Sequence, residues 1–117
     1  MTGREWVVDA FGCRPEDLRS QERLDLLFRA MIDTLGLCPI HPIQWHKFPD
    51  EGGMTGFVLL QESHLAVHTF PEHGSLCLNL FCCRPKPEFN YVYFLGREFG
   101  ADNVRVRKME RPYGVHS

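Results

Sequence analysis

Residues 62–72 read Glu62-Ser63-His64-Leu65-Ala66-Val67-His68-Thr69-Phe70-Pro71-Glu72. Apolar and polar residues alternate from Leu65 to Phe70, which predicts a β-strand whose side chains point to alternate faces of a sheet. The stretch holds two histidines, a serine, a threonine and two carboxylates. Polar chemistry of this density is hard to explain by packing alone, so this segment is the first candidate for a functional site.

Two further strands are predicted beside this one in the sequence. Residues 55–61 are rich in β-forming residues, and a turn at Pro71–Gly74 separates the central strand from the next alternating run. In that run we expect one face to carry Leu76, Leu78, Leu80 and Cys82, and the other face Cys77, Asn79, Phe81 and Cys83.

The flanking sequence adds helices to this sheet. Leu24, Leu27, Met31 and Leu35 recur at helical spacing and Gly36 follows as a cap, which predicts a helix over 20–35. A second helix is expected over 89–99, with apolar residues placed for burial on two sides. Further strands are expected at 5–11, 40–48 and 104–109. The order β-α-β-β-β-β-α-β predicts one α+β domain: a two-layer sandwich with a mostly antiparallel sheet and two helices on one face.

Composition excludes several classes of protein. The 117 residues are 44% hydrophobic and 24% charged, as expected of a folded domain rather than a disordered chain. A net charge of −2 and a pI near 6.3 argue against a general nucleic-acid binder. The short basic run at 105–108 alternates with valines and is interpreted as an edge strand with a charged outer face.

Targeting signals are absent from the sequence. It begins without the apolar segment of a signal peptide, and no run reaches the ~18 apolar residues of a membrane span, so we expect a cytoplasmic protein. An odd number of cysteines in such a chain argues for reduced thiols rather than a disulfide framework. The five are Cys13, Cys38, Cys77, Cys82 and Cys83.

The residues of this segment suggest two kinds of site, a metal site and a cysteine–histidine pair. His64 and His68 are four apart and share a strand face, but there is no C-x-x-C or H-E-x-x-H pattern, so we expect no metal. Cys83 and His68 fall on neighbouring predicted strands and could form a thiolate pair. Equally, Cys82 and Cys83 could be small core residues, and the sequence leaves that choice open.

The central segment resembles the processing motif of bacterial S-adenosylmethionine decarboxylase proenzymes. That family typically shows E-S-H-[IL]-[ST]-[IV]-H-T-[WY]-P-E and, beyond it, D-[VLI]-F-T-C-G; here Phe81-Cys82-Cys83 occupies the end of the second motif. Residues 8–13, 46–48 and 53–56 resemble the family's first strand and the segments before its cleavage site. The resemblance therefore covers nearly the whole chain.

The resemblance implies an enzyme that cleaves itself and makes its own cofactor. Ser63 would attack the carbonyl of Glu62, and His68 would remove the Ser63 α-proton, leaving a pyruvoyl group at the start of chain 63–117. Thr55 matches the family's assisting hydroxyl, where serine is usual. The pyruvoyl group would form a Schiff base with the substrate amine, and Cys83 matches the acid that protonates the product carbanion.

The same comparison implies a substrate site and an assembly. Phe48 and Phe70 correspond to aromatics that stack on adenine, and Glu72 to the carboxylate that binds ribose; Leu65 is also matched to the substrate-binding set. The implied product is decarboxylated S-adenosylmethionine, the aminopropyl donor of spermidine synthesis. The implied assembly is a homodimer of cleaved protomers.

Four positions depart from the family pattern. Ala66 replaces serine or threonine, Asn79 replaces an acidic residue, Cys82 replaces threonine and Arg84 replaces glycine. Arg84 could bind a carboxylate or simply be exposed at a strand end. The changes leave open an arginine or ornithine decarboxylase with the same chemistry, and a non-catalytic regulatory paralogue; a metal-binding module is a weaker alternative.

Overall fold

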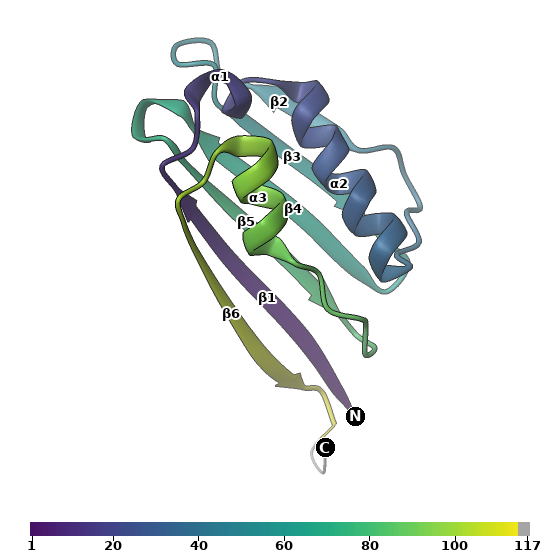
Figure 1. Cartoon of the computed structure of the whole chain (residues 1–117). Coiled ribbons are helices and arrows are strands. Elements are labelled where there is room, and N and C mark those ends of the chain that lie inside the picture. Colours follow the sequence, from purple (N-terminus) through teal and green to yellow (C-terminus); the bar gives the residue numbers. More distant parts are fainter. Residues whose placement is uncertain (115–117) are drawn as a thin grey trace.

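The computed structural model describes residues 1–114, which form one six-stranded antiparallel sheet with helices on one face (Figure 1). The strand order is β2-β3-β4-β5-β1-β6, and every pairing is antiparallel. The strands are β1 (Thr2–Phe11), β2 (Gln44–Lys47), β3 (Met54–Leu59), β4 (Ser63–Phe70), β5 (Ser75–Cys82) and β6 (Asn103–Pro112). The helices are α1 (Pro15–Leu18), α2 (Gln21–Leu35), α3 (Tyr91–Phe99) and the short 3₁₀ turn η1 (Pro71–His73). The predicted α+β two-layer sandwich is confirmed.

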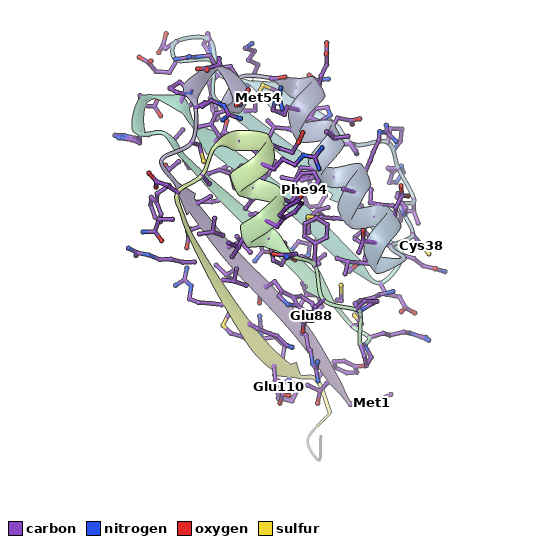
Figure 2. All side chains as sticks on the ribbon, in the orientation of Figure 1. Met1, Cys38, Met54, Glu88, Phe94 and Glu110 are labelled. Atoms are coloured by element: carbon purple, nitrogen blue, oxygen red, sulfur yellow. The ribbon has the colours of Figure 1, made fainter. Side chains whose placement is uncertain are left out.

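The core lies between the helices and one face of the sheet (Figure 2). On β5, Leu76, Leu78, Leu80 and Cys82 are buried against the helices, as the alternation predicted. The apolar stripe of α2 is also buried, with Ser20 accepting a hydrogen bond from the Arg23 amide at its start and Gly36 in the left-handed conformation at its end. Burial of these apolar side chains is the main driving force for the fold.

Several element boundaries differ from the sequence prediction. The helix predicted over 20–35 is α2, but Pro15–Leu18 form an additional short helix, α1, so three α-helices rather than two cover the sheet. The expected strand at 40–48 is only Gln44–Lys47, because the prolines at 39 and 42 cannot donate to a strand ladder. Helix α3 is buried on one side rather than two: Tyr91, Leu95 and Phe99 are buried, whereas Val92 is 58% exposed.

The second face of the sheet has no covering layer in the protomer (Figure 1). The side chains on this face, which we call the open face, include those of Thr55, Phe57, His64, His68, Phe70 and Asn79. Strand β6 is the predicted edge strand, and its alternate basic residues lie on the same face. Phe57 and Phe70 are 37% and 38% exposed, so the face presents apolar surface to its surroundings.

Candidate active site

Glu62 and Ser63 lie at the hairpin between β3 and β4. Ser63 begins β4 and pairs with Cys82 across the ladder to β5, which places its hydroxyl beside the Cys82 thiol. The carbonyl of Glu62 accepts a hydrogen bond from the backbone N–H of Cys83 at 3.3 Å. Glu62, Ser63, Cys82 and Cys83 line one small cavity of about 40 Å³. The predicted cleavage bond and the predicted proton donor are therefore adjacent.

The two neighbouring thiols have different surroundings. Cys82 is 1% exposed, and burial raises the pKa of its thiol, although the Ser63 hydroxyl acts in the opposite direction. Cys83 is half-buried and lies just after β5. The more accessible Cys83 can reach a molecule in the cavity, while Cys82 packs beneath Ser63.

Thr55 and His68 form a second group at the other end of β4. They face each other across the β3–β4 ladder, with the Thr55 hydroxyl 3.1 Å from His68 Nδ1. Thr69, the next residue, is 2% exposed; its hydroxyl accepts from the Met54 amide and donates to the Leu18 carbonyl. These bonds fix the end of β4 against β3 and α1 and so hold the pair in place.

Three predicted substrate-binding residues gather beside this pair. Phe48, Phe70 and Glu72 line a cavity of about 270 Å³, together with Asp50 and Glu51 of the β2–β3 loop. That loop is closed by a bond from the Phe48 amide to the Gly53 carbonyl at 2.7 Å, and is held to the helix layer by the Arg19 guanidinium on the Glu51 carbonyl. Two aromatic walls with carboxylates at the rim suit a flat ring attached to a cationic group.

The two groups are far apart within one protomer. Ser63 and His68 are five residues apart on one strand, which is roughly 16 Å at 3.3 Å per residue, and the odd spacing turns them to opposite faces. The expected proximity of Cys83 and His68 is also wrong: His68 pairs with Cys77, six residues before Cys83. His68 of a protomer therefore cannot reach that protomer's own Ser63.

Comparisons with known proteins identify the family of this chain. The family model described as S-adenosylmethionine decarboxylase matches residues 4–112. The chain belongs to the S-adenosylmethionine decarboxylase family. Its relatives include an S-adenosylmethionine decarboxylase proenzyme of Shouchella clausii, 30% identical over 96% of this chain and 86% of the relative. The proenzyme of Syntrophomonas wolfei is 33% identical over 94% of this chain and 90% of the relative.

The fold is shared with a solved member of the family. The crystal structure of the adenosylmethionine decarboxylase from Aquifex aeolicus aligns with a TM-score of 0.80, covering 98% of this chain and 94% of that one. At 22% identity this likeness concerns the fold alone.

One residue matched to the substrate-binding set has no accessible side chain. Leu65 is 0% exposed and points into the core between sheet and helices. Its backbone is paired on both sides, with Val58 of β3 and Leu80 of β5. A substrate of this decarboxylase family could not contact the Leu65 side chain without a rearrangement of the core.

The departures from the family motif have defined partners. Asn79 donates from its amide nitrogen to Glu5 at 2.8 Å, which leaves its oxygen to accept from His64 Nε2 at 2.9 Å. Arg84 is exposed, as one interpretation expected, but its guanidinium forms an ion pair with Glu62 at 2.6 Å. The family's acidic residue and glycine are thus replaced by a hydrogen-bonded chain on the open face and by an ion pair at the predicted cleavage bond.

Sequence reasoning overlooked one residue beside the site. The Tyr113 hydroxyl donates to the Cys83 carbonyl at 3.1 Å, because the β1–β6 pairing returns the end of β6 to this corner. No local pattern around Tyr113 signals this contact. Among residues 1–114, no three His, Cys, Asp or Glu side chains converge to hold a metal. In the same range, no helix is long and apolar enough to cross a membrane.

Proposed function

We propose that this protein is a self-processing decarboxylase of S-adenosylmethionine, cleaved between Glu62 and Ser63 into chains 1–62 and 63–117. The observation that carries the proposal is the placement of the Glu62 carbonyl on the Cys83 N–H, with the Ser63 hydroxyl and both thiols at the same cavity. A carbonyl held by a backbone donor is prepared for attack, because the donor stabilises the oxyanion that forms.

Each residue then has a stated part in the cleavage. The Ser63 oxygen attacks the Glu62 carbonyl carbon, the peptide C–N bond breaks, and an ester with a free Ser63 amine results. His68 of the partner protomer removes the Ser63 α-proton, and the Glu62 carboxylate leaves as the new end of chain 1–62. Water replaces the nitrogen of the remaining enamine and releases ammonia. Thr55, which is hydrogen-bonded to His68, supplies the hydroxyl that assists the cleavage.

The residues around position 63 fit a pyruvoyl group formed from Ser63. A pyruvoyl group there would supply a ketone that condenses with the substrate amine and accepts electrons as carbon dioxide leaves. Cys83 lines the same cavity as Ser63, and its thiol can deliver a proton to the substrate carbon that loses its carboxylate. Phe48, Phe70 and Glu72 hold the nucleoside part, and their cavity lies beside Thr55 and His68.

The separation of Ser63 and His68 along β4, roughly 16 Å, supports a site shared between two protomers. If two open faces pack about a two-fold axis that lies between them and crosses the middle of β4 at a right angle, the two β4 strands run in opposite directions across the interface. The partner's His68 then approaches the backbone of the Glu62–Ser63 end, at the face of β4 opposite the Ser63 side chain, and the reverse pairing forms a second identical site. The uncovered apolar face, with Phe57 and Phe70 more than a third exposed, supports this homodimer.

Intact-mass analysis tests the cleavage. We expect two fragments split between Glu62 and Ser63, the second lighter than its unmodified sequence by the mass change of pyruvoyl formation. Ser63→Ala should leave one full-length species. Fragments from Ser63→Ala would indicate ordinary proteolysis, and an uncleaved wild-type chain would favour the regulatory paralogue.

Trans-complementation tests the shared site. Ser63→Ala and His68→Ala chains, distinguished by a tag, are each inactive in cleavage but are expected to regain it when refolded together. Only the His68→Ala chain should be cleaved. It alone keeps Ser63, and the Ser63→Ala chain of the mixed dimer supplies His68. No cleavage in the mixture, with each chain folded and the mixed dimer present, would contradict the shared site.

Substrate identity is tested by release of labelled carbon dioxide. S-adenosylmethionine is expected to be turned over, and arginine and ornithine are not, because two aromatic walls suit an adenine ring rather than an alkyl guanidine or amine. Turnover of an amino acid alone would favour the alternative decarboxylases. The expected cytoplasmic location stays a prediction.

A further inference from the structure

The corner around Cys83 contains contacts that the proposed mechanism does not use. Arg84 Nε lies 2.6 Å from Glu62 Oε2, and the Tyr113 hydroxyl lies 3.1 Å from the Cys83 carbonyl. Both residues also border the wider opening of about 670 Å³ at this end of the sheet, where Met1 and Glu110 are labelled in Figure 2.

Glu62 is held by two successive residues of the opposite segment. The Cys83 N–H binds the Glu62 carbonyl, and the Arg84 guanidinium binds the Glu62 side chain. Two attachments fix both the position of Glu62 and the rotation of its peptide plane. The hydrogen bond from the Cys83 N–H alone would leave the Glu62 peptide free to rotate about that hydrogen bond. The side-chain pair therefore helps to keep the scissile carbonyl directed at the Cys83 N–H.

The Cys83 peptide is in turn held from its other side. Tyr113 donates to the Cys83 carbonyl, and the Tyr113 amide donates to the Met1 carbonyl at 3.2 Å, which ties the end of β6 to the start of β1. The edge of the sheet thus supports the segment that carries the N–H donor. Two other charged side chains line this corner, Arg4 and Glu110, and they pair with each other at 3.9 Å. Glu110 therefore does not compete with Glu62 for the Arg84 guanidinium.

We propose that Arg84 and Tyr113 are positioning residues for the self-cleavage: Arg84 orients the scissile Glu62 carbonyl through the Glu62 side chain, and Tyr113 steadies the Cys83 peptide that receives it. The inference rests on the proposed self-cleavage between Glu62 and Ser63. It assigns Arg84 to the cleavage step rather than to a substrate carboxylate, because its guanidinium is already engaged by Glu62.

The test follows cleavage of newly made chain in a cell-free synthesis reaction by intact mass. Arg84→Ala is expected to slow cleavage about 2- to 5-fold at low salt, the range for an exposed ion pair. Arg84→Lys should restore most of the rate, because it keeps the charge. Arg97→Ala is the matched control: Arg97 is as exposed as Arg84 and also pairs with a glutamate, but on α3, and its loss should leave the rate unchanged.

Two further readings separate positioning from general stability. Raising the salt concentration should slow the wild-type chain to the Arg84→Ala rate and leave Arg84→Ala unaffected. In the Glu62→Gln background, Arg84→Ala should have no further effect, because its partner charge is gone. An Arg84→Ala chain that cleaves at the wild-type rate, a lysine variant as slow as alanine, or equal slowing in both backgrounds would each overturn the role of Arg84.

Tyr113→Phe removes one hydroxyl and should slow cleavage by about 2- to 10-fold, the range for one net hydrogen bond. Tyr93→Phe is its control, since Tyr93 is similarly exposed on α3. Equal rates for Tyr113→Phe and wild type would overturn the role of Tyr113. A wild-type chain that never cleaves would overturn both this inference and the proposed function, whereas the variant results bear on the inference alone.

Discussion

Burial separates the cysteine thiols into reactive and protected classes. Burial raises the pKa of Cys13 to about 11 and also raises the pKa of Cys82, whereas Cys38 is exposed. In an uncleaved Ser63→Ala chain at pH 8, we expect iodoacetamide to modify Cys38 first and Cys13 roughly 100-fold more slowly, because far less thiolate is present. Peptide mass mapping over time measures this order. Rapid modification of Cys13 in the folded chain would contradict it.

Glu5 links stability to pH on the open face. The Asn79 amide and the Arg111 guanidinium hold the pKa of Glu5 below its ordinary value, against the opposing effect of burial. The carboxylate therefore stabilises the fold fully above its unfolded pKa, near 4.5, and this contribution is lost as the pH falls through the lower folded value. We expect Glu5→Gln to be less stable than wild type at pH 7 and the difference to shrink below pH 4.5. Urea unfolding at both pH values measures it; a constant difference would count against the prediction.

At the level of residues, the sequence predicted the types in the site but not their grouping. The motif around Ser63 and the cysteine pair matched the family, and the structure places both at one cavity. Ser63 and His68 are far apart because an extended strand rises about 3.3 Å per residue, so that five residues cover a long distance. The contact of Tyr113 with Cys83 depends on strand pairing over thirty positions, and no local pattern encodes it.

At the level of elements, one glycine controls how β2 and β3 meet α2. An added Cβ at Gly56 would lie 2.2 Å from Trp45, whose ring in turn packs 5.3 Å from that of Phe28 on α2. Gly56→Ala is expected to destabilise the fold by about 1–3 kcal/mol through overpacking. Gly96→Ala in α3 is the control, where the nearest atom is 3.5 Å away and helix propensity should add about 0.5–1 kcal/mol of stability. Denaturant unfolding compares the two; similar effects would refute the packing argument.

The elements that the sequence predicted well are those with strong periodicity. Strand β5 and helix α2 were correct because every buried residue repeats at the spacing of its element. Helix α3 was located correctly, but its apolar residues misled the burial prediction, since Val92 and Tyr93 are exposed in spite of their type. The short helix α1 was not predicted, because a single turn over Pro15–Leu18 is too short to show a helical period.

At the level of the whole molecule, the two-layer protomer is one half of the proposed homodimer. A two-layer sandwich leaves one sheet face uncovered, and here that face carries one half of the proposed site, the Thr55–His68 pair, together with the stacked rings of Phe57, His64 and Phe81. The protomer has the proposed cleavage bond at one end of β4 and the proposed proton acceptor, His68, near the other. Assembly and self-cleavage should therefore be inseparable in this protein.

A charge on the open face should abolish both properties together. Phe57→Glu would bury a carboxylate in the proposed interface, and we expect dimerisation to weaken roughly 10- to 100-fold and cleavage to slow with it at micromolar concentration. Leu26→Glu is the control, because Leu26 is 49% exposed on α2, away from the open face. Sedimentation and intact mass on the same samples give the two readings, with circular dichroism to establish that each variant is folded. Because a shared site needs two chains, raising the concentration of Phe57→Glu should recover cleavage as dimer reappears. Monomeric Phe57→Glu that cleaves at the wild-type rate would place His68 and Ser63 in one protomer and contradict the shared site.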